Sequence, residues 1–317
     1  MLDPDVQAML DRVLVPMTPP FGTSRLRIGH CRSQDLLGGV PTPVHLVDGF
    51  AVAPDERLGT PRLAVRRYQP RPGCPRAIVW LHGGGWVIGT LDSYDAVARA
   101  LAVASDSQIF VVDYRLSPEA PYPAPLADCS AAFEAIWMDA ARFGIDPARV
   151  VLGGDSAGGH LAVGVARWLA ALGSSARPAA LTLVYPVTDA RMRHASYARF
   201  SEGYFLTAAQ MAWFWQQFAP RGAGMKGEPV TLEHPDLSPL LAHDLHRLPA
   251  TLLVAAECDI LHDEGVAFAG ALANAGVRHE HLEIPGMIHG FLRFRAHLRQ
   301  ARDLPGQITE QLDRWGI

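Results

Sequence analysis

The chain has few cysteines, no basic cluster and no long apolar run. Its four cysteines, Cys31, Cys74, Cys129 and Cys258, lie far apart and form no C-x-x-C pair. This spacing argues against a thiolate zinc site and favours reduced, mostly buried thiols in a cytoplasmic protein. Lysine and arginine form no run that would neutralise phosphates, and the formal net charge is −4, so no nucleic-acid partner is expected. Apolar runs stay below the roughly 18 residues of a membrane-spanning helix, so no membrane span is expected.

The first residues also lack the features of a secretion signal. They read MLDPDVQAMLDRVL, with acids where a signal peptide carries positive charge and no long apolar core afterwards. A soluble, cytoplasmic protein is therefore expected. The 317 residues, 49% of them hydrophobic, are enough for one large core or for two domains.

The sequence does contain a regular succession of short apolar segments. Five of them are rich in Val, Ile and Leu without polar alternation, as in strands buried on both faces of a parallel sheet. They are residues 77–82, 109–114, 149–154, 181–186 and 251–256; a sixth, 279–284, alternates more and is expected nearer an edge. Helices are expected at 92–105, 125–143, 157–172 and 264–275, the last capped by Gly276. This succession predicts an α/β fold with a mostly parallel central sheet flanked by helices.

Two further strands and two irregular regions complete the expected organisation. VHLVDGFAV and RLAVRRYQ follow one another without a helix and are expected to add an antiparallel edge. Residues 1–45 and 188–236 do not follow the strand–helix succession; the second contains EGYFLTAAQMAWFWQQF and then the loose stretch RGAGMKGEPV. Neither makes a good core alone, so we expect them to form the two parts of one cap. Residues 46–187 and 237–317 then form the core.

One serine stands at the corner between a predicted strand and a predicted helix. Gly154-Asp155-Ser156-Ala157-Gly158 is a G-x-S-x-G sequence. Its glycines allow a strained corner that lifts the hydroxyl off the sheet, beside the free amides of a helix N-terminus. On the pentapeptide alone, a nucleophile and a plain turn are equally good interpretations, and the strand–helix context favours the nucleophile. GDSAGG is also similar to the GDSGG of trypsin-like proteases, but that fold is all-β.

A serine nucleophile needs a base, and the base needs an orienting acid. In this fold type they are expected in the order Ser, Asp or Glu, His, after late strands. Asp259 directly follows the apolar segment 251–256, whereas Asp263 and Glu264 are typical of the first turn of the next helix. Asp259 is therefore the predicted acid; its alternative interpretation is a helix-capping aspartate.

The predicted base is His289. It lies beyond the last predicted strand, in a loop opened by Pro285 and Gly286, and its alternative interpretation is a surface or core histidine. The predicted triad then has Ser156 as nucleophile, His289 as general base and later acid, and Asp259 holding the imidazole tautomer.

Three consecutive glycines follow the first predicted parallel strand, in LHGGGWVIG. H-G-G-G at this place is an oxyanion motif, completed by the amide after the nucleophile, so the predicted donors are Gly84, Gly85 and Ala157. A phosphate-binding loop is the alternative, but the segment matches neither G-x-x-x-x-G-K-[ST] nor G-x-G-x-x-G. His82 is expected to pin the loop by a hydrogen bond.

With these motifs in place, residues 76–291 resemble the hormone-sensitive-lipase branch of the α/β-hydrolases, best known from bacterial carboxylesterases. HGGGWVIG, DYRLSPEAPYPAPLADC, GDSAGGHLA, SPLLA, LPATLLVAAECDILHDEG and GMIHGF occur in that family's order. The resemblance implies a serine carboxylesterase with the triad above, an acyl-enzyme intermediate, a two-part cap, and no metal or organic cofactor. It implies a small-molecule ester as substrate and a monomer or homodimer.

Two groups of residues are assigned roles beside the triad. In DYRLSPE, Arg115 and Glu119 stand four residues apart and are expected to pair, with Asp128 anchoring the same loop. The predicted substrate pocket is lined by Trp86, Asp155, Phe205 and Phe214. Crowded aromatic side chains favour short to medium acyl chains, although packing of the cap explains aromatics equally well.

The sequence therefore predicts hydrolysis of small, uncharged, hydrophobic esters. A non-catalytic small-molecule receptor is the first alternative; plant gibberellin receptors resemble this family but lack the catalytic histidine, which here is present as His289. An amidase, lactonase or acyltransferase with the same triad is the second, because all of these attack a carbonyl.

Overall fold

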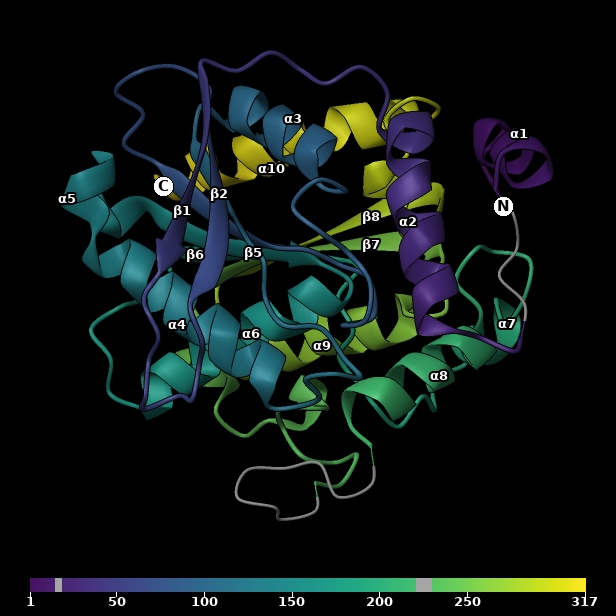
Figure 1. Ribbon diagram of the computed structural model, residues 1–317. Helices are drawn as coiled ribbons and strands as arrows, with labels where there is room; N and C mark the ends of the chain where they lie inside the picture. The colour runs from purple at the N-terminus through teal and green to yellow at the C-terminus, as the bar shows by residue number, and fades with distance from the viewer. Residues whose placement is uncertain (15–18, 221–229) are drawn as a thin grey trace.

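The computed structural model describes residues 1–14, 19–220 and 230–317, except for the side chains of residues 34–36. Within these residues, eight strands form one sheet in the order β1-β2-β4-β3-β5-β6-β7-β8 (Figure 1). The strands are β1 Leu46–Val52, β2 Leu63–Gln69, β3 Ala77–Leu81, β4 Gln108–Val112, β5 Val150–Asp155, β6 Ala180–Val184, β7 Ala250–Cys258 and β8 His279–Ile288. β4, β3 and β5–β8 run parallel to one another, and β1 and β2 form an antiparallel margin.

The expected strands match this sheet. β3, β4, β5 and β6 are buried along their whole length, which explains their unbroken apolar sequences. β8 lies at an edge of the sheet and alternates between exposed and covered positions, as its sequence predicts. The α/β architecture and the antiparallel margin are thus confirmed.

Helices cover both faces of the sheet. The core helices are α3 Asp95–Ser105, α4 Ala124–Met138, α5 Ala140–Phe143, α6 Ala157–Ala171, α9 His262–Asn274 and α10 Arg299–Trp315. In Figure 1, α3 and α10 lie on one face, and α4, α6 and α9 on the other. The sheet is therefore the middle layer of three. Because helices cover its two faces, a functional site is expected at the ends of its strands.

Two helices differ from expectation. The helix expected over 125–143 is divided at Asp139, which leaves the helical conformation with φ −89° and ψ 18° and separates α4 from α5. α10 is absent from the expected helices, although Ala301, Leu304, Ile308 and Leu312 form its buried face. Pro305 lies inside α10, and a proline normally indicates a helix boundary.

The remaining α-helices of the described residues belong to the two segments expected to form a cap. They are α1 Pro4–Arg12 and α2 Thr23–Gly38 from the N-terminal segment, and α7 Ser196–Arg199 and α8 Ala208–Phe218 from the insertion. The two segments meet where the rings of Phe21 and Trp213 approach to 5.9 Å. α1 is fixed to the core by Asp3 N, which donates to Gly286 O at 3.1 Å. Most of the loose stretch of the insertion, residues 221–229, lies outside the described residues.

The cysteines follow the expected pattern. All four carry free thiols; Cys31 is exposed, and Cys74, Cys129 and Cys258 are buried. Among the helices of the described ranges, none has the length and apolar character that crossing a bilayer requires.

Candidate active site

Ser156 occupies a strained corner between β5 and α6. Its backbone has φ 55° and ψ −121°, a conformation that residues other than glycine rarely adopt. The corner is held because Ser156 N donates to Val184 O at 2.9 Å. A methyl group on Gly158 would overlap the Leu81 carbonyl of β3, and one on Gly154 would overlap the backbone of Gly158. The two glycines are therefore required for the corner to lie against the sheet.

The structure brings the three predicted triad residues together. His289 Nε2 lies 2.9 Å from Ser156 Oγ, and His289 Nδ1 lies 2.7 Å from Asp259 Oδ2. Because a carboxylate only accepts hydrogen bonds, Nδ1 carries the proton, and the Nε2 lone pair accepts from the serine hydroxyl. Ser156 and His289 are each 7% exposed and Asp259 is 1% exposed, so little solvent competes for these hydrogen bonds.

Parallel strands explain why distant residues converge. Asp259 follows β7 and His289 follows β8, and these strands are neighbours with their carboxyl ends at the same edge. Asp259 Oδ1 also accepts from Leu261 N at 2.9 Å, which fixes the carboxylate plane. Tyr185, with φ 36°, places its ring 4.7 Å from that of His289. Sequence reasoning missed Tyr185, because a tyrosine after a strand carries no motif.

The glycine loop follows β3, which is the parallel neighbour of β5 in the sheet. Gly84 and Gly85 have φ +121° and +57°, and Gly84 O accepts from Val87 N at 3.0 Å and Ile88 N at 2.9 Å. Within the described residues, the amides of Gly84 and Gly85 donate no hydrogen bond. Ala157 N stands at the first position of α6. The amide of Ala157 therefore has no acceptor within its own helix.

Asp155 corrects the predicted pocket. It is 2% exposed, and its carboxylate is bound by buried groups of the core. Its carboxylate accepts from Trp80 Nε1 at 3.3 Å, Gly83 N at 3.1 Å and Tyr94 OH at 2.7 Å. Although Asp155 precedes Ser156, the corner turns the two side chains apart. Asp155 therefore supports the glycine loop, and burial raises the pKa of its carboxyl.

His82 holds the loop from its start, as predicted. Its Nδ1 lies 2.9 Å from Gly83 O, and Tyr114 OH donates to His82 O at 2.6 Å. Burial lowers the pKa of His82 to about 4, so the ring is neutral near pH 7. Tyr94 and Tyr114 were not among the predicted residues, since nothing local to either indicates that it will reach this loop.

The aromatic residues divide into two groups. Trp86 is 0% exposed and stacks on Phe218 with ring centroids 4.3 Å apart, so it belongs to the packing beneath the loop and does not line an open pocket. Phe214 of α8 lies directly over Gly85, whose added methyl would overlap its ring. Phe205 lies beside Gly290, the residue after the histidine. Of the predicted pocket residues, Phe214 thus contacts the glycine loop and Phe205 contacts the loop that follows His289.

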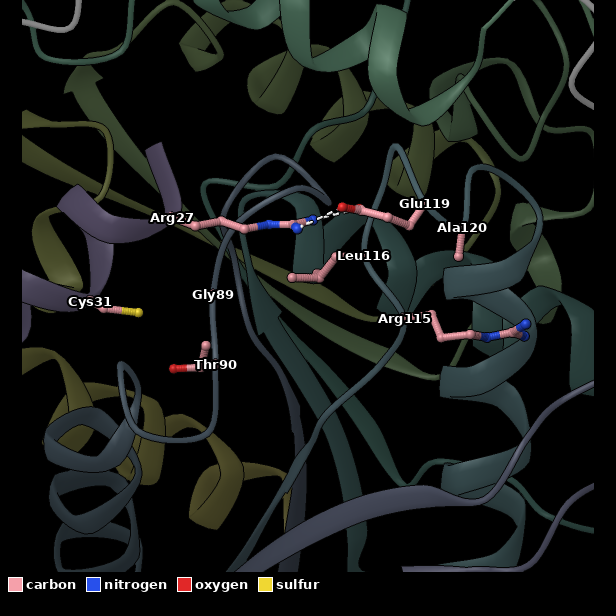
Figure 2. A pocket seen from close by; sticks show the side chains of 8 residues that line it. All are labelled: Arg27, Cys31, Gly89, Thr90, Arg115, Leu116, Glu119 and Ala120. Carbon is pink, nitrogen blue, oxygen red and sulfur yellow. Dashed lines mark hydrogen bonds and ion pairs between the residues drawn. The ribbon is translucent and has the colours of Figure 1, made fainter. Parts of the chain in front are cut away.

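The predicted pair between Arg115 and Glu119 is wrong. Arg115 pairs with the fully buried Asp128 at 2.6 Å, and Glu119 pairs with Arg27 of α2 at 2.8 Å (Figure 2). The segment that contains Arg115 and Glu119 is not helical, so a spacing of four residues does not place the two side chains on one face. Asp128 anchors the loop as expected.

Several known proteins are similar to this chain. Residues 78–293 match a family model described as alpha/beta hydrolase fold. The chain is 37% identical over 254 residues to the ethyl acetate hydrolase of Pseudomonas putida, covering 79% of this chain and 78% of that protein. It is 33% identical over 321 residues to carboxylesterase NlhH of Mycobacterium tuberculosis, covering 99% and 96%.

Solved structures give the same result over the whole chain. An ester-hydrolase from the metagenome of Lake Arreo superposes with a TM-score of 0.90 at 34% identity, covering 100% of both chains. A hyperthermophilic esterase of Pyrobaculum calidifontis superposes with a TM-score of 0.90 at 31% identity, covering 99% of both.

Proposed function

The chain belongs to the alpha/beta hydrolase fold family, among its carboxylic ester hydrolases similar to hormone-sensitive lipase, and from this premise we propose that it hydrolyses short- to medium-chain, uncharged, hydrophobic esters through an acyl-enzyme on Ser156. The observation that carries the proposal is the hydrogen-bonded series from Asp259 through His289 to the Ser156 hydroxyl. The proposed reaction has no step that requires a metal or a cofactor.

In the first half-reaction, Ser156 Oγ attacks the ester carbonyl carbon while its proton passes to His289 Nε2. Asp259 stabilises the imidazolium that forms. The carbonyl oxygen becomes an oxyanion and accepts hydrogen bonds from the amides of the glycine loop and of Ala157. When the intermediate collapses, His289 Nε2–H protonates the departing alkoxide. The alcohol is released, and the acyl group stays bound to Ser156 as an acyl-enzyme.

In the second half-reaction, water replaces the alcohol. His289 takes a proton from water, and the resulting oxygen nucleophile attacks the acyl carbon through a second oxyanion. Collapse returns the proton from Nε2 to Ser156 Oγ and releases a carboxylic acid. The overall reaction adds one water across the ester bond, and the protein returns to its starting state.

The cap supports a restriction to modest acyl chains. We propose that residues 1–45 and 188–236 together cover the serine, with Phe214 and Phe205 closing the space on its two sides. Phe214 packs so closely on Gly85 that little depth remains beside the oxyanion donors. The name of one relative, an ethyl acetate hydrolase, also indicates a small ester for that protein.

Hydrolysis of p-nitrophenyl esters tests the proposal. The wild type is expected to hydrolyse the butyrate, and Ser156→Ala to lose activity by on the order of 10⁵–10⁶-fold because no nucleophile remains. Ser175→Ala, at an exposed serine after α6, is the matched control and should retain full activity. An inactive wild type would revive the receptor alternative, and activity that survives Ser156→Ala would remove Ser156 as nucleophile.

A second series separates substrate classes. Rates over acetate to palmitate esters are expected to peak at short or medium chains; a maximum at the longest chains would contradict the proposed pocket. The corresponding p-nitroanilides and a γ-lactone are expected to react more slowly than the esters, because an anilide nitrogen and a lactone alkoxide are poorer leaving groups than p-nitrophenolate. Faster anilide or lactone hydrolysis would favour the amidase or lactonase alternative.

A further inference from the structure

The glycine loop is held by side chains and backbone groups from several parts of the chain. At its start, Gly83 N donates to Asp155 and to Tyr94 OH. In its middle, Trp86 O accepts from Ser117 N at 2.9 Å. The next carbonyl, Val87 O, accepts from Arg27 Nε at 2.9 Å. The first two supports belong to the core, whereas Arg27 belongs to α2 of the N-terminal segment.

Arg27 donates to four acceptor atoms in three residues. Besides Val87 O, its Nη2 donates to Ser117 O at 3.0 Å, and Nη1 and Nη2 donate to the two oxygens of Glu119 at 2.8 Å each (Figure 2). Arg27 thereby contacts both the loop and the residue whose amide holds the loop. Only a planar guanidinium presents donors in this arrangement; a lysine ammonium would reach one or two of the acceptors.

α2 provides a fixed base for Arg27. Leu26 is buried in the core, and His30, one turn after Arg27, is also buried. His30 Nδ1 lies 2.9 Å from Arg293 Nη1 and His30 Nε2 lies 3.2 Å from Ser93 Oγ. Arg293 lies four residues beyond His289, so the same helix is joined to the segment that carries the histidine.

We propose that Arg27 is a positioning residue for the oxyanion hole, which it serves by holding Val87 O and with it the preceding amides of Gly84 and Gly85. This inference rests on the proposed function. The side chains of Arg27 and Glu119 are 32% and 63% exposed, and ion pairs this exposed contribute little to stability. The role of Arg27 is therefore to fix the shape of the loop, and its loss should affect turnover much more than folding.

A cavity beside the pair provides a direct test. Its volume is about 450 Å³, and it is lined by Arg27, Glu119, Leu116, Ala120, Gly89 and Thr90, among others (Figure 2). In Arg27→Ala, a free guanidinium ion can enter this space and meet the acceptors that the side chain has left: Glu119, Ser117 O and Val87 O. Chemical rescue is thus expected for a positioning role.

The experiment compares Arg27→Ala with Arg25→Ala, which removes an exposed arginine from the same helix. We expect kcat for p-nitrophenyl butyrate to fall about 10- to 100-fold in Arg27→Ala, as for a small displacement of catalytic groups, with little change in KM or Tm. Binding of a trifluoromethyl ketone, whose adduct places an oxyanion in the hole, should weaken in the same proportion. Guanidinium chloride at millimolar concentration should restore part of kcat, and Arg25→Ala should match the wild type throughout.

Four outcomes would overturn the proposal: unchanged kcat and inhibitor binding in Arg27→Ala, an equal loss in Arg25→Ala, a loss that follows Tm alone, or no response to guanidinium. If Arg27→Ala does not fold, Arg27→Lys replaces it in the experiment. A smaller loss of kcat is then expected, and a kcat equal to that of the wild type would contradict the inference. The proposed function fails separately, through an inactive wild type or an active Ser156→Ala.

Discussion

The proposed triad and the proposed oxyanion hole are built in different ways. In the triad, Asp259 and His289 follow adjacent parallel strands; Asp259 Oδ2 lies 2.7 Å from His289 Nδ1, and His289 Nε2 lies 2.9 Å from Ser156 Oγ. The proposed oxyanion donors are instead backbone amides, two of them in a loop that contains two consecutive glycines with positive φ, Gly84 and Gly85. The triad is therefore positioned by the sheet, whereas the glycine loop is positioned by side chains that reach it from elsewhere.

The difference shows where each half of the site is sensitive to change. A triad residue acts through its own side chain, so a substitution removes the chemistry itself. A loop amide belongs to the backbone and is kept by every substitution except proline, and its position depends on Asp155, Tyr94, Tyr114 and Arg27. Substitutions on the loop side should thus produce graded losses of oxyanion stabilisation, with the triad still intact.

The largest effect is expected on the triad side. Asp259→Asn should lower kcat by about 10⁴-fold, because the amide permits the wrong imidazole tautomer, while Tm changes little. Asp263→Asn is the matched control: it removes a carboxylate four residues later that binds Ser196 N and Arg199 and should cost less than about 10-fold in kcat. Assays with p-nitrophenyl butyrate give kcat, and thermal melts give Tm. Equal losses of kcat in the two variants would contradict the assignment of Asp259 as the acid.

A smaller, selective effect is expected on the loop side. Tyr94→Phe removes the hydroxyl that donates to Asp155 at 2.7 Å and accepts from Gly83 N at 2.9 Å, so the residue before the oxyanion donors loses one support. We expect kcat to fall about 10- to 100-fold, with matching loss of trifluoromethyl ketone affinity, and stability to fall by about 1–3 kcal/mol.

Tyr122→Phe separates these two consequences. Tyr122 OH donates to Asp236 at 2.9 Å, in a buried network that does not include the glycine loop. Its loss should lower Tm to a similar extent while kcat stays near that of the wild type. If both variants lose kcat in proportion to Tm, Tyr94 has no specific role in the loop.

The smallest effect is expected on the pH dependence of folding stability, through the buried carboxyl of Glu264. Glu264 is fully buried and accepts from Thr188 N at 2.7 Å and Tyr197 OH at 3.0 Å, and burial raises its pKa from 4.5 to about 8. Because the pKa of Glu264 is higher in the folded protein than in the unfolded chain, Glu264 binds more protons in the folded state at pH values between the two. The stability contributed by the protonated carboxyl is complete below about pH 4.5 and is lost as pH rises through about 8.

Glu264→Gln should therefore flatten this part of the pH dependence. Melts at several pH values from acid to mildly alkaline should show a fall in wild-type Tm that the variant lacks, by a few degrees, since about 1 kcal/mol moves Tm by roughly 2–4 °C in chains of comparable size. Glu280→Gln, at an exposed position of β8, is the control and should keep the wild-type slope. The same slope in all three proteins would show that Glu264 ionises as readily in the fold as in the unfolded chain.

Patterns local to a few residues were sufficient for most of the core. Buried strands such as β3 and β5 are recognisable because a strand covered on both faces has no polar positions. The corner at Ser156 is recognisable because glycines two residues to either side are needed where backbone approaches backbone. Asp259 and His289 could be placed because they follow late strands, and the carboxyl ends of parallel strands meet at one edge.

The sequence was misleading where a side chain has a choice of partners. Asp155 is adjacent to Ser156 but turns away from it, and Trp86 is adjacent to the oxyanion donors but packs beneath them. Arg115 binds Asp128, and Glu119 binds Arg27, although Arg115 and Glu119 are much closer to each other along the chain. Spacing along the chain predicts a contact only inside a regular helix or strand, and these residues lie in neither or at its end.

The amino-acid sequence by itself thus determined the sheet, the strained corner and the convergence of Ser156, Asp259 and His289, since each depends on hydrophobic burial, on backbone sterics within a short segment or on the order of the strands. Only the tertiary structure decided how the glycine loop is held, because the side chains that hold it come from α2 and from residues 94, 114 and 155. Hydrogen bonds between distant segments depend on distances and angles that exist once the chain has folded, and no local pattern encodes them.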